Sequence, residues 1–542
     1  MIDVSVRDSP GWWIQRQFRR LANPKRRRRL QKLYDWQHGN APLPDGTEFA
    51  KESFRAFMRQ SRTNFAELLT TSVSERMVPH GFRTAADGDE TGDQAAVDLW
   101  ERAGMDVRAA DLHDLMLSMS EAYVIVGDVD DETGAPLVSA EDPRWMIGEP
   151  DPLMPWRCLA ALKVTHDDMD EVDRAYLYLP GKVYVATRPN RYGSAPGGPD
   201  WWSTSTGDGM VRPNDYGPAP TVYFDPRAWS WDEERGGAEG QTLRHSRMPV
   251  VRFEAKDGMG VFEPHLDLLS RITNVILQRS VVTTMQAFRQ RAIKGLPNVY
   301  PEGHARAGEE IDYTDVFSMD PAALWQIPAT ADIWESQQAS LDGILAAIKD
   351  DVTQLAAVSK TPIHALMPAG QNQSAEGAAM QREGLVEKVS NQIKRTSHPW
   401  AWVMSLAFET LGDRRRADLA KLKVLWRSPE RLSLAERADA ASKAQDIPWR
   451  SRMLYIWEFP PSVVERMASE RADELLFQAQ LAAQTAALQG ADAALSQQTA
   501  QAGATGRSPV PPIPGQPAGD VLADPLAGLP APLDAGPAGE FV

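Results

Sequence analysis

The sequence predicts a predominantly helical α+β fold, and three observations lead to this prediction. Apolar residues recur at helical spacing over two long stretches, 265–295 and 336–358. Short segments rich in β-branched and aromatic residues, separated by turn residues, gather between residues 122 and 253. The chain of 542 residues has ordinary globular composition, with 42% hydrophobic and 24% charged residues, and is long enough to form several packed units.

Composition argues against several classes of function. The single cysteine, Cys158, cannot form an intrachain disulfide, and the nine histidines offer no short-range ligand pairs, so we expect no metal site and no cofactor. No stretch approaches the roughly 20 apolar residues that span a bilayer, and the N-terminus lacks an apolar signal core. We therefore expect a cytosolic protein with no membrane contact. The net charge of -16 argues against general nucleic-acid binding, although an acidic surface suits a conduit along which DNA slides.

The first 45 residues are expected to form a basic helical segment. Residues 11–36 carry apolar side chains at helical spacing, and Pro24 must bend or break the helix. The basic run Lys25 to Arg29 has two interpretations: it contacts DNA or another anionic partner, or it is a solvated helix face.

Residues 46–264 are expected to mix helices and strands. The candidate helices are Glu48–Ser74, Gln94–Ala103 and Ala109–Ser120. The candidate strands are Ala122–Val129, Leu137–Ser139, Cys158–Thr165, Ala175–Leu179, Lys182–Ala186 and Pro249–Phe253. Turn residues at 130–136 predict that the first two strands form a hairpin. The stretch Arg188–Gly240 is rich in Gly, Pro, Trp and Asp, which predicts a long surface loop or an inserted ornament.

Two long helices are expected on either side of a small module at residues 296–335. The first is His265–Lys294, bounded by Pro264 and Gly295, and the second is Ser336–Val358. Each has an apolar stripe that is too long for one small domain to cover, so we expect both helices to pack between neighbouring subunits. The residues expected at this contact are Leu268, Ile272, Val275 and Val282.

The C-terminal part is expected to be helical apart from its tail. Residues 359–374 form a loop by composition, and Ser374 is a good N-cap for a long helix to residue 413 that Pro399 should kink. Residues 414–490 are expected to be predominantly helical. Beyond Gly490 the chain is rich in Ala, Gln, Pro and Gly, and it has too few large apolar groups to order, which predicts disorder over 491–542.

Signatures of catalysis are missing from the sequence. Gly181-Lys182 lacks the first glycine and the hydroxyl residue of a phosphate-binding loop. The acidic turn at 128–132 lacks the glycine and the bidentate glutamate of a calcium loop. No nucleophile-elbow pattern and no His-Glu-x-x-His pair occurs. We therefore expect that the protein is not an enzyme.

The order of several short segments resembles the portal family of tailed bacteriophages with long non-contractile tails. The resemblance covers residues 30–470, and its evidence is the order of the segments rather than any one of them. These segments are Leu33–Asn40, Asn64, Val73–Arg83, Ser120–Val126, Asp142-Pro143, Pro249–Phe253 and Lys360–Leu366, followed by Asn372, Ser374 and Glu376.

The resemblance implies a portal fold with wing, stem, clip, crown and tunnel-loop parts. After the basic segment 1–45, a mixed α/β wing would occupy 46–264. Stem helices at 265–295 and 336–358 would flank a small α/β clip at 296–335. A tunnel loop at 359–374, a long kinked wing helix at 375–413, a helical crown at 414–490 and the disordered tail at 491–542 would follow.

The resemblance also implies a function and partners. Such portals are homo-oligomeric rings, dodecamers in this family, that assemble in the host cytoplasm and sit at one capsid vertex of the virion, at the head-tail junction. Double-stranded DNA passes through them without sequence specificity during packaging and ejection. The expected protein partners are the terminase large subunit, the head-to-tail adaptor, and the major capsid and scaffold proteins.

Particular residues would carry these contacts. In the clip, Glu309, Glu310 and Asp312 would present acidic groups to the motor and the adaptor, although a solvated charge cluster explains them equally well. In the tunnel loop, Lys360, His364 and Asn372 would lie nearest to DNA, and without the resemblance a polar connector between two helices explains that segment.

Other functions stay open at the level of sequence. Another phage minor head or scaffold-associated protein would share this composition without closing into a ring. An uncharacterised enzyme would have a concave site with perturbed ionisable groups. A membrane-surface protein would be held by its basic N-terminal helix.

Overall fold

The computed structural model describes residues 2–43, 58–86, 92–190, 224–287, 291–313, 332–335, 340–367, 375–432, 434–459 and 461–503. The chain divides into two units, Met1–Arg466 and Met467–Val542. The elements described below belong to the first unit, except that helix α14 (Pro461–Gly503) extends into the second.

The first core of this unit lies on a three-stranded antiparallel sheet. Its strand order is β10 (Val250–Glu254), β2 (Glu121–Val129) and β3 (Pro136–Glu141). The hairpin predicted between residues 122 and 139 is confirmed, with Val126 opposite Val138. Strand β2 is buried on both faces, because alternate residues enter two different clusters: Val124 in one and Ile125 in the other.

The core also contains residues of helices α5 (Gln94–Arg102), α6 (Met105–Met119) and α11 (Ala375–Thr410). Helix α11 continues through Pro399, and the predicted kink there stays a prediction. The chain returns beneath the end of α6 at Gly260, where a Cβ atom would lie 2.3 Å from the Ser118 carbonyl oxygen. Only glycine allows this close approach of two backbones.

The first core is closed by a strand that the sequence analysis missed. Strand β1 (Pro79–Arg83) pairs antiparallel with β13 (Lys423–Trp426), and Phe82 lies opposite Val424. Leu422 is buried in the core, and Val424 and Trp426 pack against it. The prediction that 414–490 is predominantly helical is therefore wrong for residues 423–426. Leu422, Val424 and Trp426 contact the core at every second position, which is the spacing of residues on one face of a strand.

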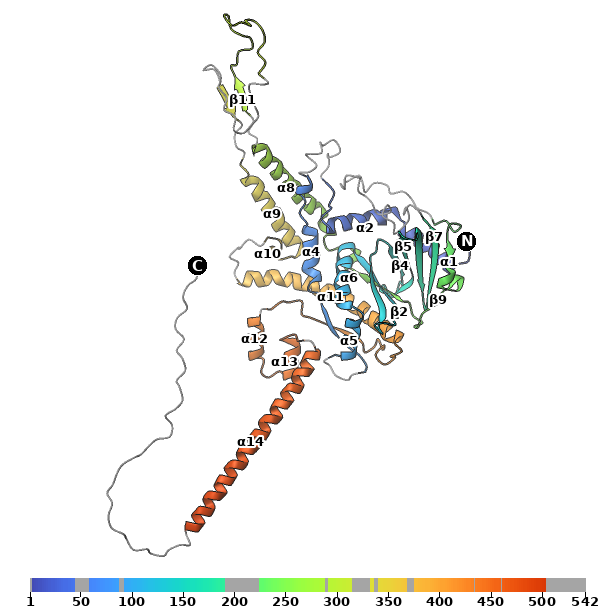
Figure 1. The fold of residues 1–542 in the computed structure, drawn as a ribbon, viewed down its shortest axis with the longest axis vertical. Coiled ribbons are helices and arrows are strands. Elements are labelled where there is room, and N and C mark those ends of the chain that lie inside the picture. The colour runs from blue at the N-terminus through green and yellow to red at the C-terminus, as the bar shows by residue number, and fades with distance from the viewer. Residues whose placement is uncertain are drawn as a thin grey trace, which may run out of the picture. The chain divides into compact units, whose positions relative to one another are not determined.

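A second antiparallel sheet lies beside the N-terminal helix (Figure 1). Its order is β4 (Met146–Pro150), β5 (Cys158–Asp167), β6 (Val172–Leu179), β7 (Lys182–Pro189) and β8 (Ser230–Trp231), and β9 (Gln241–Thr242) also pairs with β7. Helix α1 (Pro10–Leu21) packs Ile14, Phe18 and Leu21 into the core of this sheet. Residues 2–21 are therefore part of the same packed body as the sheet.

The surface loop predicted over Arg188–Gly240 is wrong for its last part. Phe224 and Trp229 are buried in the core under α1, and the Phe18 and Phe224 ring centroids are 5.4 Å apart. Burying two large aromatic rings outweighs the cost of ordering the segment that carries them. Residues 191–223 of the predicted loop lie outside the described residues.

The predicted break of the basic N-terminal helix at Pro24 is confirmed. Helix α1 ends at Leu21, and α2 (Pro24–Gln37) begins at Pro24, where the first turn needs no amide donor. The Asn23 side chain accepts a hydrogen bond from the Lys25 amide at 2.9 Å and caps α2. The helix predicted over 48–74 is also divided: residues 58–60 are helical, and α4 (Phe65–Ser74) starts after a break at 61–64.

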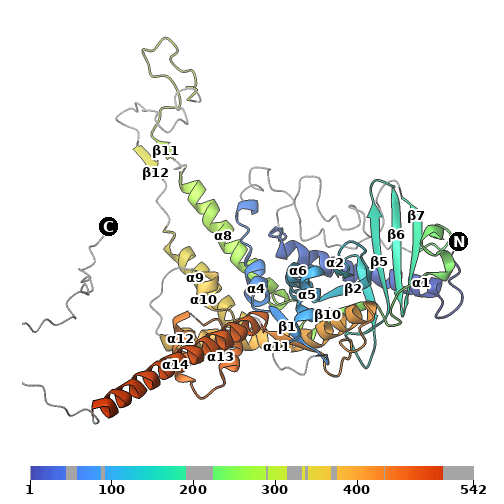
Figure 2. The same ribbon diagram turned by 60° about the horizontal axis from the view of Figure 1, so that its bottom comes forward.

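Two helices and a strand pair form an arm on the first unit (Figures 1 and 2). Helices α8 (Leu266–Ala287) and α9 (Asp342–Ser359) are antiparallel neighbours, because the first half of α8 and the second half of α9 share one core. Strands β11 (Arg291–Lys294) and β12 (Asp332–Glu335) pair antiparallel. We call α8, α9 and this strand pair the arm.

Both predicted arm helices need new bounds. The prediction that the first extends to Lys294 is wrong, because residues 291–294 form strand β11, with Ile293 opposite Ile333. Its helical repeat of apolar residues ends at Met285, so nothing in the sequence beyond that point requires a helix. The second helix begins at Asp342 instead of Ser336, and the Ser340 hydroxyl accepts a hydrogen bond from the Asp342 amide at 3.2 Å.

The last described elements are helices α12 (Leu434–Lys443), α13 (Trp449–Tyr455) and α14. Helix α14 continues to Gly503, so the prediction of disorder from residue 491 is wrong for 491–503. Alanine and glutamine favour helix with little loss of side-chain entropy, which explains the continuation. Residues 504–542 lie outside the described residues. None of the helices in the described ranges is long and apolar enough to cross a membrane.

Candidate functional site

In the basic run Lys25–Arg29 on α2, several arginine side chains form hydrogen bonds and ion pairs within the chain. Arg26 Nη2 donates to Glu121 at 2.8 Å and to the carbonyl oxygen of Pro143 at 2.8 Å. Arg29 forms a two-pronged pair with Glu263, at 2.6 and 2.7 Å. Arg27 is buried, and burial lowers its pKa to about 10. The solvated-face interpretation is wrong for Arg27, which is buried, whereas contact of the run with an anionic partner stays a prediction.

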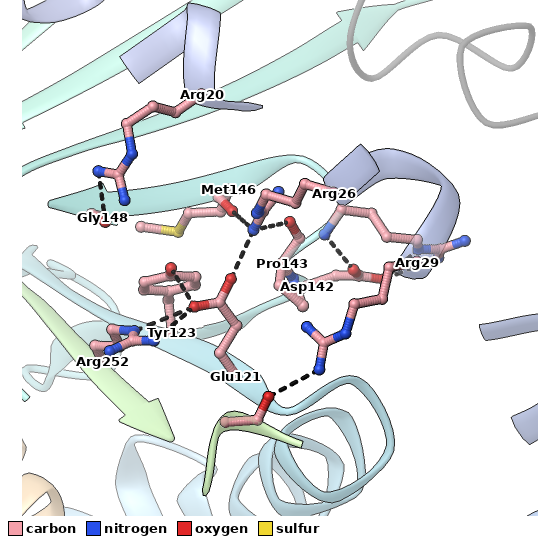
Figure 3. Close-up of polar contacts among 12 residues, drawn as sticks. Arg20, Arg26, Arg29, Glu121, Tyr123, Asp142, Pro143, Met146, Gly148 and Arg252 are labelled. Atoms are coloured by element: carbon pink, nitrogen blue, oxygen red, sulfur yellow. Dashed lines mark hydrogen bonds and ion pairs between the residues drawn. The ribbon is translucent and has the colours of Figure 1, made fainter. Parts of the chain in front are cut away.

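The centre of this network is Glu121 at the start of β2 (Figure 3). Besides Arg26, it accepts hydrogen bonds from Arg252 Nη2 at 3.0 Å and from the Tyr123 hydroxyl at 3.1 Å. Burial disfavours ionisation of Glu121, but the charges of Arg26 and Arg252 outweigh it and hold its pKa at about 2. The carboxylate therefore stays ionised and ties α2 to two strands of the sheet.

This network was missed by sequence reasoning, although its signal was present. Glu121, Asp142-Pro143 and Arg252 each lie within a segment that carries the family resemblance, and Glu121 and Arg252 are charged residues in strands of otherwise apolar character. A buried charge in such a strand needs a partner, and here the strands supply partners for one another. These three segments of the resemblance therefore meet in space around Glu121 and Arg26.

The base of the arm is packed within the chain. Leu269, Ile272 and Ile276 of α8 and Val352 and Leu355 of α9 are buried in one cluster. Arg271 Nη2 bridges the two helices by an ion pair to Asp351 at 2.8 Å. The cluster also contains residues of α2 and α4, so the arm is rooted in the body of the first unit.

The four residues predicted to contact neighbouring subunits fall into two groups. Ile272 is fully buried and Leu268 packs against the same cluster, both at the base of the arm. The prediction is wrong for Ile272, because its own chain covers the side chain completely. Val275 and Val282 are half-buried in the single chain.

The distal half of the arm is less well covered. Leu341, Ile344 and Ile348 of α9 and its N-terminal flank are half-buried, and the Leu345 side chain is 47% exposed. On α8, Val281 and Val282 are also half-buried. The apolar stripes of both helices thus extend beyond the core that the chain itself provides.

The segment after β11 is held by main-chain contacts and carries the three acidic residues predicted for docking. The Tyr300 amide donates to the Glu309 carbonyl oxygen at 3.1 Å, and the Ile311 amide donates to the Asn298 carbonyl oxygen at 3.0 Å. The Tyr313 hydroxyl donates to the Pro297 carbonyl oxygen at 2.7 Å. Glu309, Glu310 and Asp312 are exposed on this segment. Residues 314–331 lie outside the described residues.

The connector 360–373 differs from the predicted loop. Lys360 ends α9 in the left-handed region with φ of 55°, and a short helix, α10 (Ile363–Leu366), follows. Leu366 is buried in the cluster at the base of the arm, which orders this part of the connector. A loop over 360–373 is therefore wrong for 363–366. Asn372, which was predicted near DNA, lies outside the described residues.

Two lysines meet beside this connector. Lys360 and His364 have exposed side chains. Lys388 of α11 donates from Nζ to the Ser359 carbonyl oxygen at 2.9 Å. Burial and the nearby charge of Lys360 lower the pKa of Lys388 to about 8. The connector thus begins at a locally cationic position.

Comparisons with known proteins add a family match. A family model described as "Phage portal protein, SPP1 Gp6-like" matches residues 21–474. The portal proteins of Mycobacterium phages D29 and L5 are 23% and 22% identical to the chain over 397 residues, covering 71% of this chain and 72% of each relative.

Similar solved structures come from gene transfer agent particles. A chain from the neck of a native particle, computed with C12 symmetry, has a TM-score of 0.36 and 12% identity, covering 77% of this chain and 94% of that chain. A chain from the virion of the native particle has a TM-score of 0.34 and 12% identity, covering 79% and 99%. The family model spans both sheets, the Glu121 network and the arm.

Proposed function

Because the chain belongs to the phage portal protein family, we propose that copies of it form a ring at one capsid vertex, through which double-stranded DNA enters and leaves the head. The observation that carries this proposal is the family match over residues 21–474. We propose a dodecamer, located at the head-tail junction of the virion and assembled in the host cytoplasm. The protein is a structural component in this proposal, and no reaction is assigned to it.

Ring contacts are proposed along the distal half of the arm. The half-buried Val282 and the exposed Leu345 support this, because a single chain leaves their apolar surface partly in water. Val275 is also half-buried, but it lies closer to the base, between Ile272 and Ile276. Packing the same surfaces against a neighbouring copy would remove that surface from water. The base of the arm, including Ile272, holds the arm to its own chain instead.

Docking of the packaging motor and then of the adaptor is proposed at the acidic segment after β11. Its support is the exposure of Glu309, Glu310 and Asp312 on a segment held mainly by its own backbone. Exposed carboxylates steer the approach of a basic partner and set its orientation. The terminase large subunit and the head-to-tail adaptor are the proposed partners, and the major capsid and scaffold proteins are proposed neighbours of the ring.

DNA proximity is proposed for the connector between α9 and α11. The exposed side chains of Lys360 and His364 support it, and Asn372 is included on the family resemblance. A lysine beside a backbone phosphate provides attraction without sequence information. In a chain with a net charge of -16 such contacts would be few, which suits DNA that has to slide.

Electron microscopy and sedimentation of the purified full chain test the ring and its contacts. We expect rings with an axial hole from the parent chain. The double variant Val282→Asp/Leu345→Asp should give folded monomers, with unchanged far-ultraviolet circular dichroism, because charges enter the contact between copies. The single variant Ile272→Asp should unfold, because it places a charge in the core of its own chain.

A matched control uses two exposed apolar residues away from the arm. Val107 and Leu153 are 64% and 88% exposed, so Val107→Asp/Leu153→Asp should leave the rings intact. Rings that persist in the Val282→Asp/Leu345→Asp variant would move the subunit contact away from the distal arm. A parent chain that stays monomeric at high concentration would overturn the ring itself.

A further inference from the structure

A pocket of about 390 Å³ lies between the end of α4 and the segment that joins β13 to α12. The pairing of β1 with β13 brings its two sides together, and the Arg427 amide donates to the Val78 carbonyl oxygen at 3.0 Å. We call it the arginine pocket, because four arginines line it: Arg76, Arg427, Arg431 and Arg437. They lie far apart in the sequence, so no basic run marks the site.

The carboxylates in the pocket do not balance these arginines. Glu458 pairs closely with Arg437, at 2.7 Å. The other carboxylate, that of Glu75, is 3.6 Å from Arg431 Nη2, and both side chains are more than half exposed, so this pair is weak.

Two guanidinium groups have no carboxylate partner among the described residues. Arg76 Nη1 donates to the Pro429 carbonyl oxygen at 2.8 Å, which provides an acceptor but no charge. The guanidinium of Arg427 forms no hydrogen bond or ion pair within the part of the chain that the structure describes. Burial, and the like charges of Arg431 and Arg382, lower the pKa of Arg76, although the charge of Glu75 opposes this shift. The pocket thus holds positive charge that an anion would stabilise.

In two other pockets of the first unit, most of the cations have carboxylate partners. In a pocket of about 810 Å³ beside β3 and β5, Arg144 pairs with Asp142 at 2.8 Å and Lys163 pairs with Glu141 at 2.7 Å. In a pocket of about 190 Å³, Arg26 and Arg252 share Glu121. In the arginine pocket, by contrast, two of the four arginines have no carboxylate partner among the described residues, in a chain that carries net negative charge.

We propose that the arginine pocket binds a phosphate group, and that the backbone of double-stranded DNA supplies it. Guanidinium groups bind phosphate oxygens through paired hydrogen bonds, and several guanidinium groups together neutralise the charge of the phosphate. Free phosphate offers the same chemistry. The choice of DNA rests on the proposed portal function, which brings DNA close to the chain.

Binding to two probes, measured on the full-length chain, tests this. The probes are a labelled 20-base-pair DNA, followed by fluorescence anisotropy, and inorganic phosphate, followed by calorimetry. The variant Arg427→Gln/Arg431→Gln removes two exposed guanidinium groups and should keep the fold. We expect at least a tenfold loss of DNA affinity, and a salt dependence of log affinity that is shallower by about 1–2. Phosphate should compete with DNA on the parent chain and not on the variant.

The control Arg227→Gln/Arg244→Gln makes the same change of charge at two exposed arginines outside the pocket. If both double variants lose DNA affinity equally, general electrostatics explains the effect and the pocket proposal is overturned. Lost phosphate binding with unchanged DNA affinity would keep the phosphate site and overturn DNA as its source. Tighter binding of an oligoglutamate peptide than of either probe would overturn the phosphate assignment.

Electron microscopy of the parent chain and of both double variants measures ring assembly. Rings should form in both double variants, because neither alters the arm. A parent chain that forms no ring but binds phosphate in the pocket would overturn the proposed function and leave the phosphate site standing.

Discussion

The side chain of Glu121 lies where helix α2 and strands β2 and β10 meet, and it contacts all three. Its carboxylate accepts from Arg26 of α2, Arg252 of β10 and Tyr123 of its own strand. Removing a charge from water is costly, and the two arginines offset that cost only while the carboxylate is ionised. The network thus favours one arrangement of α2 on the sheet over others.

Glu121→Gln should destabilise the first unit by about 3–5 kcal/mol, because it leaves two largely buried arginines without their shared counter-charge. Since the folded pKa of about 2 lies below the usual value, the stabilisation is present above about pH 4.5 and is lost as the pH falls toward 2. Chemical denaturation at several pH values measures both effects. Glu254→Gln is the control, because Glu254 also pairs with Arg252 but is more exposed, and it should cost less than about 1 kcal/mol. Equal losses in both variants would contradict the central role of Glu121.

The arginines also mark the limit of sequence reasoning about the site. Lys25–Arg29 stands out as a basic run, yet two of its five cations, Arg26 and Arg29, pair with Glu121 and Glu263, which lie far away in the sequence. Arg76 and Arg427 stand out in no local pattern, yet they meet in the arginine pocket. Whether an arginine is available to a ligand depends on the position of carboxylates in space, and a single sequence does not contain that information.

At the scale of elements, helices α6 and α11 are joined by a polar contact inside an apolar seam. Trp400 Nε1 of α11 donates to His113 Nε2 of α6 at 3.0 Å, and both side chains are buried. Burial lowers the pKa of His113 to about 3, against a backbone hydrogen bond with Met77 that raises it. The imidazole is therefore neutral at neutral pH, as an acceptor for Trp400 must be.

This contact should make the first unit sensitive to mild acid. Because the folded pKa of His113 lies below its ordinary value of 6.5, the stabilisation is complete above pH 6.5 and declines as the pH falls toward 3. Between pH 7 and pH 4.5 the expected loss is about 3 kcal/mol in the free energy of unfolding. His113→Gln keeps an acceptor without a titratable group, so its stability should fall less over this range. Parallel slopes for parent and variant, measured by denaturant titration, would show that other groups cause the acid sensitivity.

Elements with sustained periodicity were predictable, and short elements with distant partners were not. The long helices α8, α9 and α11 carry apolar repeats over several turns. These repeats predicted the helices correctly but did not predict where each helix begins and ends. Strand β13 is four residues long and pairs with β1, more than three hundred residues earlier. Strand β11 was merged with the preceding helix because no Gly or Pro lies between Ala287 and Arg291, and its partner β12 comes much later in the chain.

At the scale of the whole molecule, the apolar cores end well before the chain does. Every cluster of buried apolar residues found in the described ranges lies between Ile2 and Leu422. In the second unit the large apolar side chains of α14, including Leu476 and Phe477, are more than half exposed. A helix that buries so little gains its order from propensity alone within one chain.

Removal of residues 467–542 should therefore leave the stability of the first unit unchanged. We expect the midpoint of cooperative thermal unfolding to shift by less than about 2 °C, because no core cluster loses a member. The full chain and the truncated chain should both carry Val282→Asp/Leu345→Asp, so that contacts between copies do not contribute to their stability. The full chain should show additional helical signal that melts gradually at lower temperature, since an unsupported helix loses its ends progressively. Scanning calorimetry and far-ultraviolet circular dichroism distinguish the two transitions. A midpoint lowered by 5 °C or more in the truncated chain would mean that the second unit stabilises the first.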